Sequence, residues 1–108
     1  MSLNLQTIES AGQATIELSG EFLGGEQTRT LDDEFTRLLD GGMKKITLNF
    51  KKVWFANSSG IGLLVRLHLR AQKANSQLVI ESPGENVLKS IVAMQLDKVL
   101  SIETSNPA

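Results

Sequence analysis

Apolar and polar residues alternate in two short stretches at the start of the chain, residues 3–8 and 14–18, on either side of the turn-forming sequence Ser-Ala-Gly at 10–12. Alternation of this kind is typical of strands with one buried face, so the sequence predicts an N-terminal β-hairpin. Between residues 26 and 40 the apolar positions recur at helical spacing, at Leu31, Phe35, Leu38 and Leu39. This spacing predicts a helix, which the sequence Asp-Gly-Gly at 40–42 ends.

The rest of the chain continues as strands that alternate with helices. Residues 45–50 alternate and run on into the apolar stretch 53–55, which predicts a buried strand and its exit. Residues 61–74 contain no proline and are rich in Leu, Arg, Lys, Ala and Gln, so we expect a helix there. Three further elements are predicted: a strand at 78–80, a helix at 83–94 and a short strand at 99–102.

The predicted helix at 83–94 has a start signature of its own. Ser82 is a favoured N-cap residue, and Pro83 suits the first helical position. Glu85 stands three residues after the serine, where it closes a capping box. The sequence therefore predicts a helix that begins directly after Ser82.

Strands that alternate with helices indicate the α/β class. We expect a single domain over residues 1–108, because a chain of this length can form one core but not two. The sheet is expected to be mixed and mostly parallel, entered by the N-terminal antiparallel hairpin and covered by α-helices, with residues 1–2 and 104–108 frayed. Sites in such sheets lie beyond the carboxyl ends of the strands, where residues 55–60 fall.

Composition and charge argue against several classes of function. Eleven basic and twelve acidic residues give a net charge of −1, and no run of Lys or Arg exceeds two residues, so we expect no nucleic-acid partner. With no cysteine and one histidine, we expect no metal site, and no cofactor is predicted. The N-terminus lacks a signal-peptide pattern, and no apolar run approaches the roughly 20 residues of a membrane helix. The expected location is cytoplasmic, without membrane insertion.

The candidate chemistry is concentrated in residues 57–62 (Asn-Ser-Ser-Gly-Ile-Gly), between a predicted strand and a predicted helix. Asn57, Ser58 and Ser59 are N-cap residue types, so one of them should accept a hydrogen bond from the first helical turn. A cap alone would need no further function. The same N–H groups and the helix dipole would also favour a phosphate, and Gly60 and Gly62 would let another protein approach closely. Both interpretations are open from the residues alone.

Three motifs stand out together with the order of the elements: Gly-Glu at 20–21, Asn-Ser-Ser-Gly-Ile-Gly at 57–62 and Leu-Asp-Lys-Val-Leu at 96–100. In this combination the chain resembles the STAS domain family of anti-sigma factor antagonists. The resemblance covers essentially the whole chain. Its most specific part is the family signature Asp-Ser-Ser/Thr-Gly-Leu/Ile-Gly, which the sequence matches except at Asn57.

The resemblance implies a phosphoprotein that acts by partner switching in transcription regulation. In the family, the serine that matches Ser58 is phosphorylated by an anti-sigma factor that is itself an ATP-dependent serine kinase. The unphosphorylated antagonist binds that anti-sigma factor and releases sigma, whereas the phosphorylated form cannot bind. A PP2C-type phosphatase is a further implied partner.

Site residues follow from the same resemblance. Ser58 is the expected phosphorylation site, and Ser59 is the second candidate, with a main role at the helix start. The expected partner-binding residues are Glu21, Phe22, Asn57, Ser59, Gly60, Ile61, Gly62 and Leu63.

Three positions depart from the family pattern, and each lacks a carboxylate: Asn57 in the signature, Leu23 after the Gly-Glu pair, and Asn49 near the end of the central strand. If a kinase reads those carboxylates, Ser58 would be a poorer substrate. Conversely, a phosphoserine carries about −1.5 to −2 charges, and Asn57 repels it less than Asp would. The alternative function is a STAS binding module or scaffold without phosphorylation, in a signalling assembly or a lipid-transport complex.

An enzyme is the remaining class, because residues 56–60 (Ala-Asn-Ser-Ser-Gly) approximate the nucleophile elbow of α/β-hydrolases. A hydrolase needs a base, and the sole histidine, His68, lies ten residues along the same predicted helix, about 15 Å of axial rise from Ser58. Its spacing places it with the apolar residues Ile61, Leu64, Val65 and Ala71. We therefore expect packing for His68 and no enzyme.

Other residues near the motif could serve either packing or a partner. Leu63 and Leu67 form a second apolar stripe that is expected to pack on a neighbouring helix, with a partner surface as the alternative. Lys51 and Lys52 are expected to be solvated charges. Trp54 is expected in the core, but it would be an anchor for a partner if it is exposed.

Overall fold

The computed structural model describes residues 3–104. Its strands are β1 (Leu3–Ser10), β2 (Gln13–Phe22), β3 (Lys45–Ala56), β4 (Gln77–Glu81) and β5 (Ser101–Glu103). The helices are α1 (Arg29–Asp40), α2 (Ser58–Lys73) and α3 (Glu85–Ala93), with two 3-10 helices, η1 (Gly25–Thr28) and η2 (Leu96–Lys98). The predicted fraying of residues 1–2 and 105–108 lies outside the described residues, and Thr104 follows β5 without regular structure.

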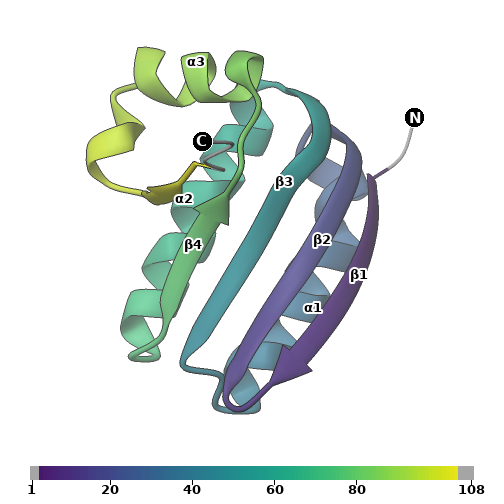
Figure 1. Ribbon diagram of the computed structural model, residues 1–108, viewed down its shortest axis with the longest axis vertical. Helices are drawn as coiled ribbons and strands as arrows, with labels where there is room; N and C mark the ends of the chain where they lie inside the picture. The colour runs from purple at the N-terminus through teal and green to yellow at the C-terminus, as the bar shows by residue number, and fades with distance from the viewer. Residues whose placement is uncertain (1–2, 105–108) are drawn as a thin grey trace.

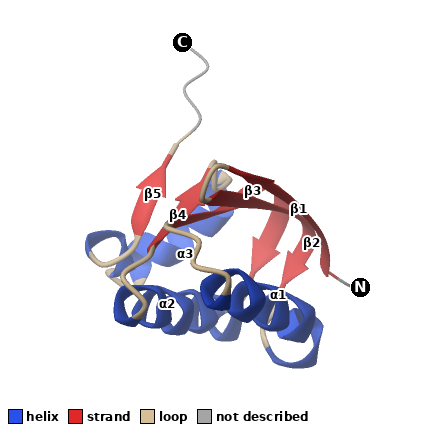
Figure 2. Ribbon diagram, turned by 90° about the horizontal axis from the view of Figure 1, so that it is seen from below, coloured by secondary structure: helices blue, strands red, loops and turns tan. Residues whose placement is uncertain are grey.

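The five strands form one mixed sheet in the order β1-β2-β3-β4-β5 (Figure 1). β1 and β2 form the predicted antiparallel hairpin, and every later neighbour pairs in parallel. Because the strand order follows the chain order, each crossover steps in the same direction, and right-handed crossovers then place the connecting helices on the same face. Figure 2 shows α1 and α2 packed on one side of the sheet. The predicted α/β class is confirmed, with one face of the sheet covered.

The core lies between this covered face and the helices. Alternate residues of β2 and of the first half of β3 point into it, and the apolar faces of α1, α2 and α3 meet them. The rings of Phe22 and Phe50 lie 5.0 Å apart between their centroids, close to the carboxyl ends of β2 and β3. Fully buried members of the core include Ile16, Leu18, Phe35, Leu38, Ile46, Leu48, Leu64, Ile80 and Ile91.

The predicted start of the last helix is wrong. α3 begins at Glu85, its N-cap is Gly84, and no side chain caps it. Ser82 adopts a left-handed conformation with φ 55°, and its N–H donates to the carbonyl of Glu103 at 2.7 Å. Ser82 therefore extends the pairing of β4 with β5 by one hydrogen bond. It does not cap α3, as its sequence motif suggested.

A charged cluster joins the edge strand β1 to α1. Arg37 donates from Nε and Nη2 to the two carboxylate oxygens of Glu34, each at 2.9 Å, and also to Glu9 of β1 at 2.8 Å. Thr7 of β1 donates to the same Glu34 carboxylate at 2.5 Å. These hydrogen bonds from Arg37 and Thr7 lower the pKa of Glu34 to about 2. The ionised carboxylate therefore stabilises the contact between the hairpin and the helix layer.

Replacing Glu34 should make this contribution visible as a pH dependence. A carboxyl whose pKa is lowered by folding stabilises the fold above its unfolded pKa of about 4.3, and the contribution disappears as the pH falls toward 2. Arg37 is 55% exposed, so solvent screening limits the effect to about 1 kcal/mol. We expect Glu34→Gln to lower the free energy of unfolding by that amount at pH 7, measured by urea denaturation.

The difference between wild type and Glu34→Gln should shrink steadily below pH 5, because protonated Glu34 resembles glutamine. Glu26→Gln is the matched control, since Glu26 makes only a 3.8 Å contact with Arg29 and both side chains are largely exposed. A difference that stays constant from pH 7 to pH 3 would contradict the assignment.

Candidate functional site

The predicted cap at the start of α2 is confirmed, and the capping residue is Asn57. Its Oδ1 accepts a hydrogen bond from the Gly60 N–H at 2.8 Å, and its carbonyl accepts from the Ile61 N–H at 3.0 Å. Ser58 and Ser59 are the first two helical residues, so the role of Ser59 at the helix start is not that of the cap. Their own N–H groups have no acceptor within the helix because they belong to its first turn.

The first turn of α2 is suited to an anion. The side chains of Ser58 and Ser59 are exposed, and the first turn contains no acidic residue. The positive end of the helix dipole coincides with the unpaired N–H groups. A negative group carried by either hydroxyl would meet favourable electrostatics here.

Gly60 brings this turn into direct contact with the end of β2. A Cβ at Gly60 would lie 2.1 Å from the Phe22 carbonyl oxygen and 2.8 Å from the Phe22 ring. The same carbonyl accepts a hydrogen bond from the Asn57 N–H at 3.3 Å. Gly60 therefore serves close packing of helix on strand, and it does not open the surface to a partner as the sequence suggested.

The loop after β2 packs against the other serine. Gly24 has φ 77° and ψ −175°, a conformation that favours glycine. A Cβ on Gly24 would lie 2.9 Å from the backbone carbon of Ser59 and 3.0 Å from its Cβ. Ser59 therefore lies against the loop. Ser58 is rotated by about 100° around the helix axis from Ser59, and it shares the outer face of α2 with Gly62 and the 53% exposed Leu69.

The structure divides the predicted partner-binding residues into two groups. Ser59 is exposed, and Glu21, Asn57 and Gly62 are half-buried. The other four are buried, and their contact with a partner stays a prediction: Phe22, Gly60, Ile61 and Leu63. These four residues pack beneath the first turn of α2. Leu67 is also fully buried, so the second apolar stripe belongs to the core.

Strand β3 carries two β-bulges against β2 in the half that leads to the site. Its buried side chains there recur every third residue instead of every second, at Phe50, Val53 and Ala56. Each bulge adds one residue to β3, so two consecutive side chains face solvent after Phe50 and again after Val53. These pairs are Lys51 with Lys52 and Trp54 with Phe55, and we call the four residues the bulge patch.

The expectation that Trp54 lies in the core is therefore wrong. Unbroken alternation from Phe50 would have turned Trp54 inward, but the bulges leave it 63% exposed. The rings of Trp54 and Phe55 lie 6.3 Å apart between their centroids. The one hint in the sequence was Lys52, which unbroken alternation would also have placed in the core.

Asn49 is not close to the predicted phosphorylation site. It lies in the middle of β3, eight residues and about 25 Å of extended strand before Asn57. Its Oδ1 accepts a hydrogen bond from the Lys51 N–H at 2.8 Å, beside the first bulge. Of the three departures from the family pattern, only Asn57 and the half-buried Leu23 lie at the end of the sheet where α2 and Ser58 begin.

Hydrolase chemistry finds no support in the geometry of Ser58. His68 lies three turns along the same helix, about 15 Å of axial rise away, so it cannot serve as a base for Ser58. Among residues 3–104, no three His, Cys, Asp or Glu side chains gather in a way that could hold a metal ion. Within the same range, no helix has the length and hydropathy to cross a bilayer.

A family model for the STAS domain matches residues 2–106. The chain belongs to the STAS domain family. No curated protein matches the sequence. Among solved structures, an anti-sigma factor antagonist from Mycobacterium paratuberculosis is similar with a TM-score of 0.81 and 17% identity, over 96% of this chain and 87% of that one. A putative anti-sigma factor antagonist from Thermotoga maritima gives a TM-score of 0.80 and 18% identity, over 94% and 86%.

The STAS domain is also similar to both forms of one antagonist. Unphosphorylated SpoIIAA gives a TM-score of 0.72 and 15% identity, over 95% of this chain and 90% of that one. Phosphorylated SpoIIAA from Bacillus gives the same TM-score with 18% identity, over 94% and 93%. At these identities the similarity establishes the fold.

The two glycines of the α2 start should respond in opposite ways to alanine. Gly60→Ala must displace the Phe22 backbone, so we expect it to lower the free energy of unfolding by about 2–3 kcal/mol. The Cβ added by Gly62→Ala would have no atom within 4 Å. We expect this substitution to raise the free energy of unfolding by about 0.5–1 kcal/mol, because alanine is the better helix former. Urea denaturation of both variants measures this; equal effects would refute the close-packing role of Gly60.

Proposed function

We propose that this STAS domain is an anti-sigma factor antagonist whose binding to an anti-sigma factor with serine kinase activity is controlled by phosphorylation of Ser58. The observation that carries the proposal is the exposed Ser58 hydroxyl on the first turn of α2, above N–H groups without a helical acceptor. Membership of the STAS family and structural similarity to anti-sigma factor antagonists support it.

Ser58 suits the modification better than Ser59. A phosphate on Ser58 points from the outer face of α2, where the helix dipole favours it and solvent can reach it. A phosphate on Ser59 would start from a Cβ that already lies against the loop at Gly24. The proposal therefore assigns the phosphate to Ser58.

Phosphorylation would act by local charge, without refolding of the domain. The turn rests on the rigid contact between Gly60 and Phe22, and a phosphate at its solvent side displaces no buried group. Both unphosphorylated and phosphorylated SpoIIAA share the fold of this chain, each with a TM-score of 0.72. A partner that buries the turn must desolvate the doubly charged phosphate, which costs several kcal/mol unless the partner supplies compensating charge.

The proposed partner surface is centred on Ser58 and includes the accessible members of the predicted set, Glu21, Asn57, Ser59 and Gly62. An anti-sigma factor with kinase activity would add the phosphate, and a PP2C-type phosphatase would remove it. The kinase would transfer the phosphate from ATP to the Ser58 hydroxyl, and the phosphatase would hydrolyse the resulting phosphate ester, so no bound cofactor is required of the antagonist itself.

Substitution of each serine tests the phosphorylation site. Incubation with the purified anti-sigma factor and ATP should place one phosphate on wild type and on Ser59→Ala, and none on Ser58→Ala, as measured by intact-protein mass spectrometry. The unmodified proteins should all bind the anti-sigma factor. Phosphate that persists on Ser58→Ala and disappears from Ser59→Ala would reassign the site, and a domain that binds its partner without any phosphate transfer would favour the binding-module alternative.

The unusual Asn57 allows a second test. Asn57→Asp keeps an oxygen for the cap on Gly60 and adds the carboxylate of the family signature, so the fold should be preserved. If the kinase reads this carboxylate, we expect a faster phosphorylation rate, with the affinity of the unmodified protein changed by about 1 kcal/mol at most. Kinetic assays with Asn57→Ala, which removes the cap without adding a carboxylate, separate the two roles; an unchanged rate in Asn57→Asp would show that the carboxylate is irrelevant here.

A further inference from the structure

The bulge patch lies outside the partner surface proposed around Ser58, and it exposes two large aromatic side chains next to each other. Trp54 is 63% exposed and Phe55 is 44% exposed, with their rings in contact. Exposed pairs of this kind leave apolar surface in water, and Trp is among the residues that dominate binding energy in protein interfaces. The bulges that expose the pair are features that commonly adjust the direction of side chains beside functional sites.

We propose that the bulge patch is a second contact for the same anti-sigma factor that binds the Ser58 turn. The Trp54 indole would fill an apolar pocket of that partner, and carboxylates beside the pocket would pair with Lys51 and Lys52. This inference rests on the proposed function, because it assigns both contacts to one partner.

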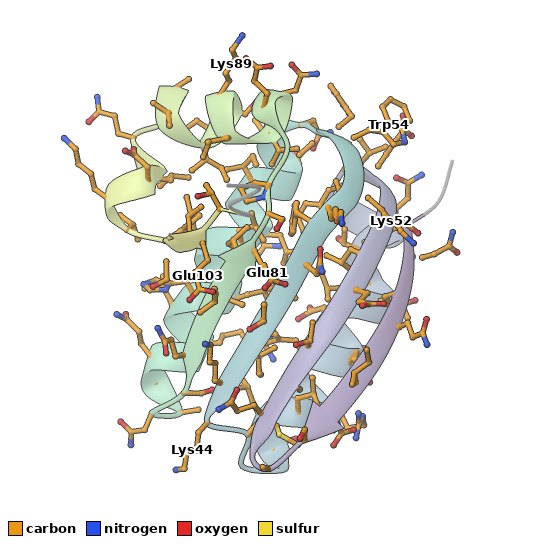
Figure 3. The ribbon with its side chains drawn as sticks, in the orientation of Figure 1. Lys44, Lys52, Trp54, Glu81, Lys89 and Glu103 are labelled. Atoms are coloured by element: carbon orange, nitrogen blue, oxygen red, sulfur yellow. The ribbon has the colours of Figure 1, made fainter. Side chains whose placement is uncertain are left out.

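The geometry allows one partner to cover both contacts. Trp54 precedes Ser58 by four residues, so their Cα atoms lie at most about 14 Å apart. A standard interface covers about 800 Å² on each protein, which corresponds to a disc about 30 Å across. In Figure 3, Trp54 and Lys52 project from the end of the sheet where β2 and β3 finish and where α2 begins. Lys44 lies at the opposite end.

The charges favour a protein over a lipid surface. Neither Lys51 nor Lys52 forms an ion pair with another residue in the range 3–104, so both are available to carboxylates of a partner. Lys52 also lines a shallow hollow of about 160 Å³ together with Glu17, and Glu21 pairs with Phe55 across the sheet. These glutamates make the surroundings mixed in charge, which suits a protein with complementary charges and disfavours an anionic bilayer.

Trp54 provides a specific probe because it is the only tryptophan of the chain. Protein labelled with 5-fluorotryptophan should give one fluorine NMR resonance. We expect this resonance to shift on addition of the unlabelled anti-sigma factor, and to return to its free position when Ser58 is phosphorylated. Calorimetry should show that Trp54→Ala weakens binding of the unphosphorylated protein tenfold or more. Its melting temperature should stay unchanged because the side chain is largely solvated.

Two matched controls isolate the patch. Ile8→Ala removes a 50% exposed apolar side chain from the edge strand β1, close to the hairpin turn, and should leave affinity unchanged. The double substitution of Lys51 and Lys52 by Glu should weaken binding tenfold or more and alter its salt dependence, whereas Lys44→Glu at the opposite end should not.

The possible results separate the two proposals. If the anti-sigma factor binds wild type and is released by phosphate on Ser58, but the fluorine resonance stays in place and Trp54→Ala binds within twofold, the patch inference is wrong and the switch stands. If wild type does not bind the anti-sigma factor at all, the proposed function fails and the inference with it. A resonance that moves with vesicles of equal parts phosphatidylcholine and phosphatidylserine, and not with the anti-sigma factor, overturns the inference in favour of a lipid surface.

Discussion

The contact between the first turn of α2 and the last residue of β2 controls the architecture of the site. Gly60 lies so close to the Phe22 carbonyl that no larger side chain fits, and the same carbonyl accepts a hydrogen bond from Asn57. A helix fixed by its backbone cannot shift without disrupting the end of the sheet. The serines that follow the cap are consequently presented on a rigid base, which is the condition under which a single charged group can change binding without changing the fold.

The bulges of β3 lie at the same end of the sheet, where β3 extends beyond its pairing with β4. β4 pairs with β3 only as far as Asn49, whereas β3 continues alongside β2 to Ala56. Over this extension every third residue points inward, which keeps Phe50, Val53 and Ala56 in the core while the pairs between them face solvent. The extension therefore contributes both to the core beneath α2 and to the surface around Ser58.

The similarity to anti-sigma factor antagonists of known structure, at 15–18% identity, shows how little of the exact sequence this fold requires. One apolar face per strand, one apolar stripe per helix and a few glycines at close approaches are enough to specify the layers. Asn57 shows that a position of the family signature can keep its structural role when the residue changes. It retains the cap on Gly60, as an aspartate would, while it lacks the charge that a kinase could read.

The sequence by itself determined the identity and order of the main elements, the hairpin, the class of the sheet and the capped turn at residues 57–60. These features are local, because alternation, helical spacing and N-cap residues act over a few neighbouring positions. It was misleading for Trp54 and for the start of α3, and it did not reveal that Gly60 is buried against Phe22. Each of these depends on a neighbour far along the chain. The pairing with β2 sets the register of β3, and the carbonyl of Glu103 in β5 accepts the hydrogen bond from the Ser82 N–H. The Phe22 backbone leaves no room for a side chain at Gly60. Only the tertiary structure decided these positions, because strand register and backbone contact between distant segments leave no periodic signal in the sequence.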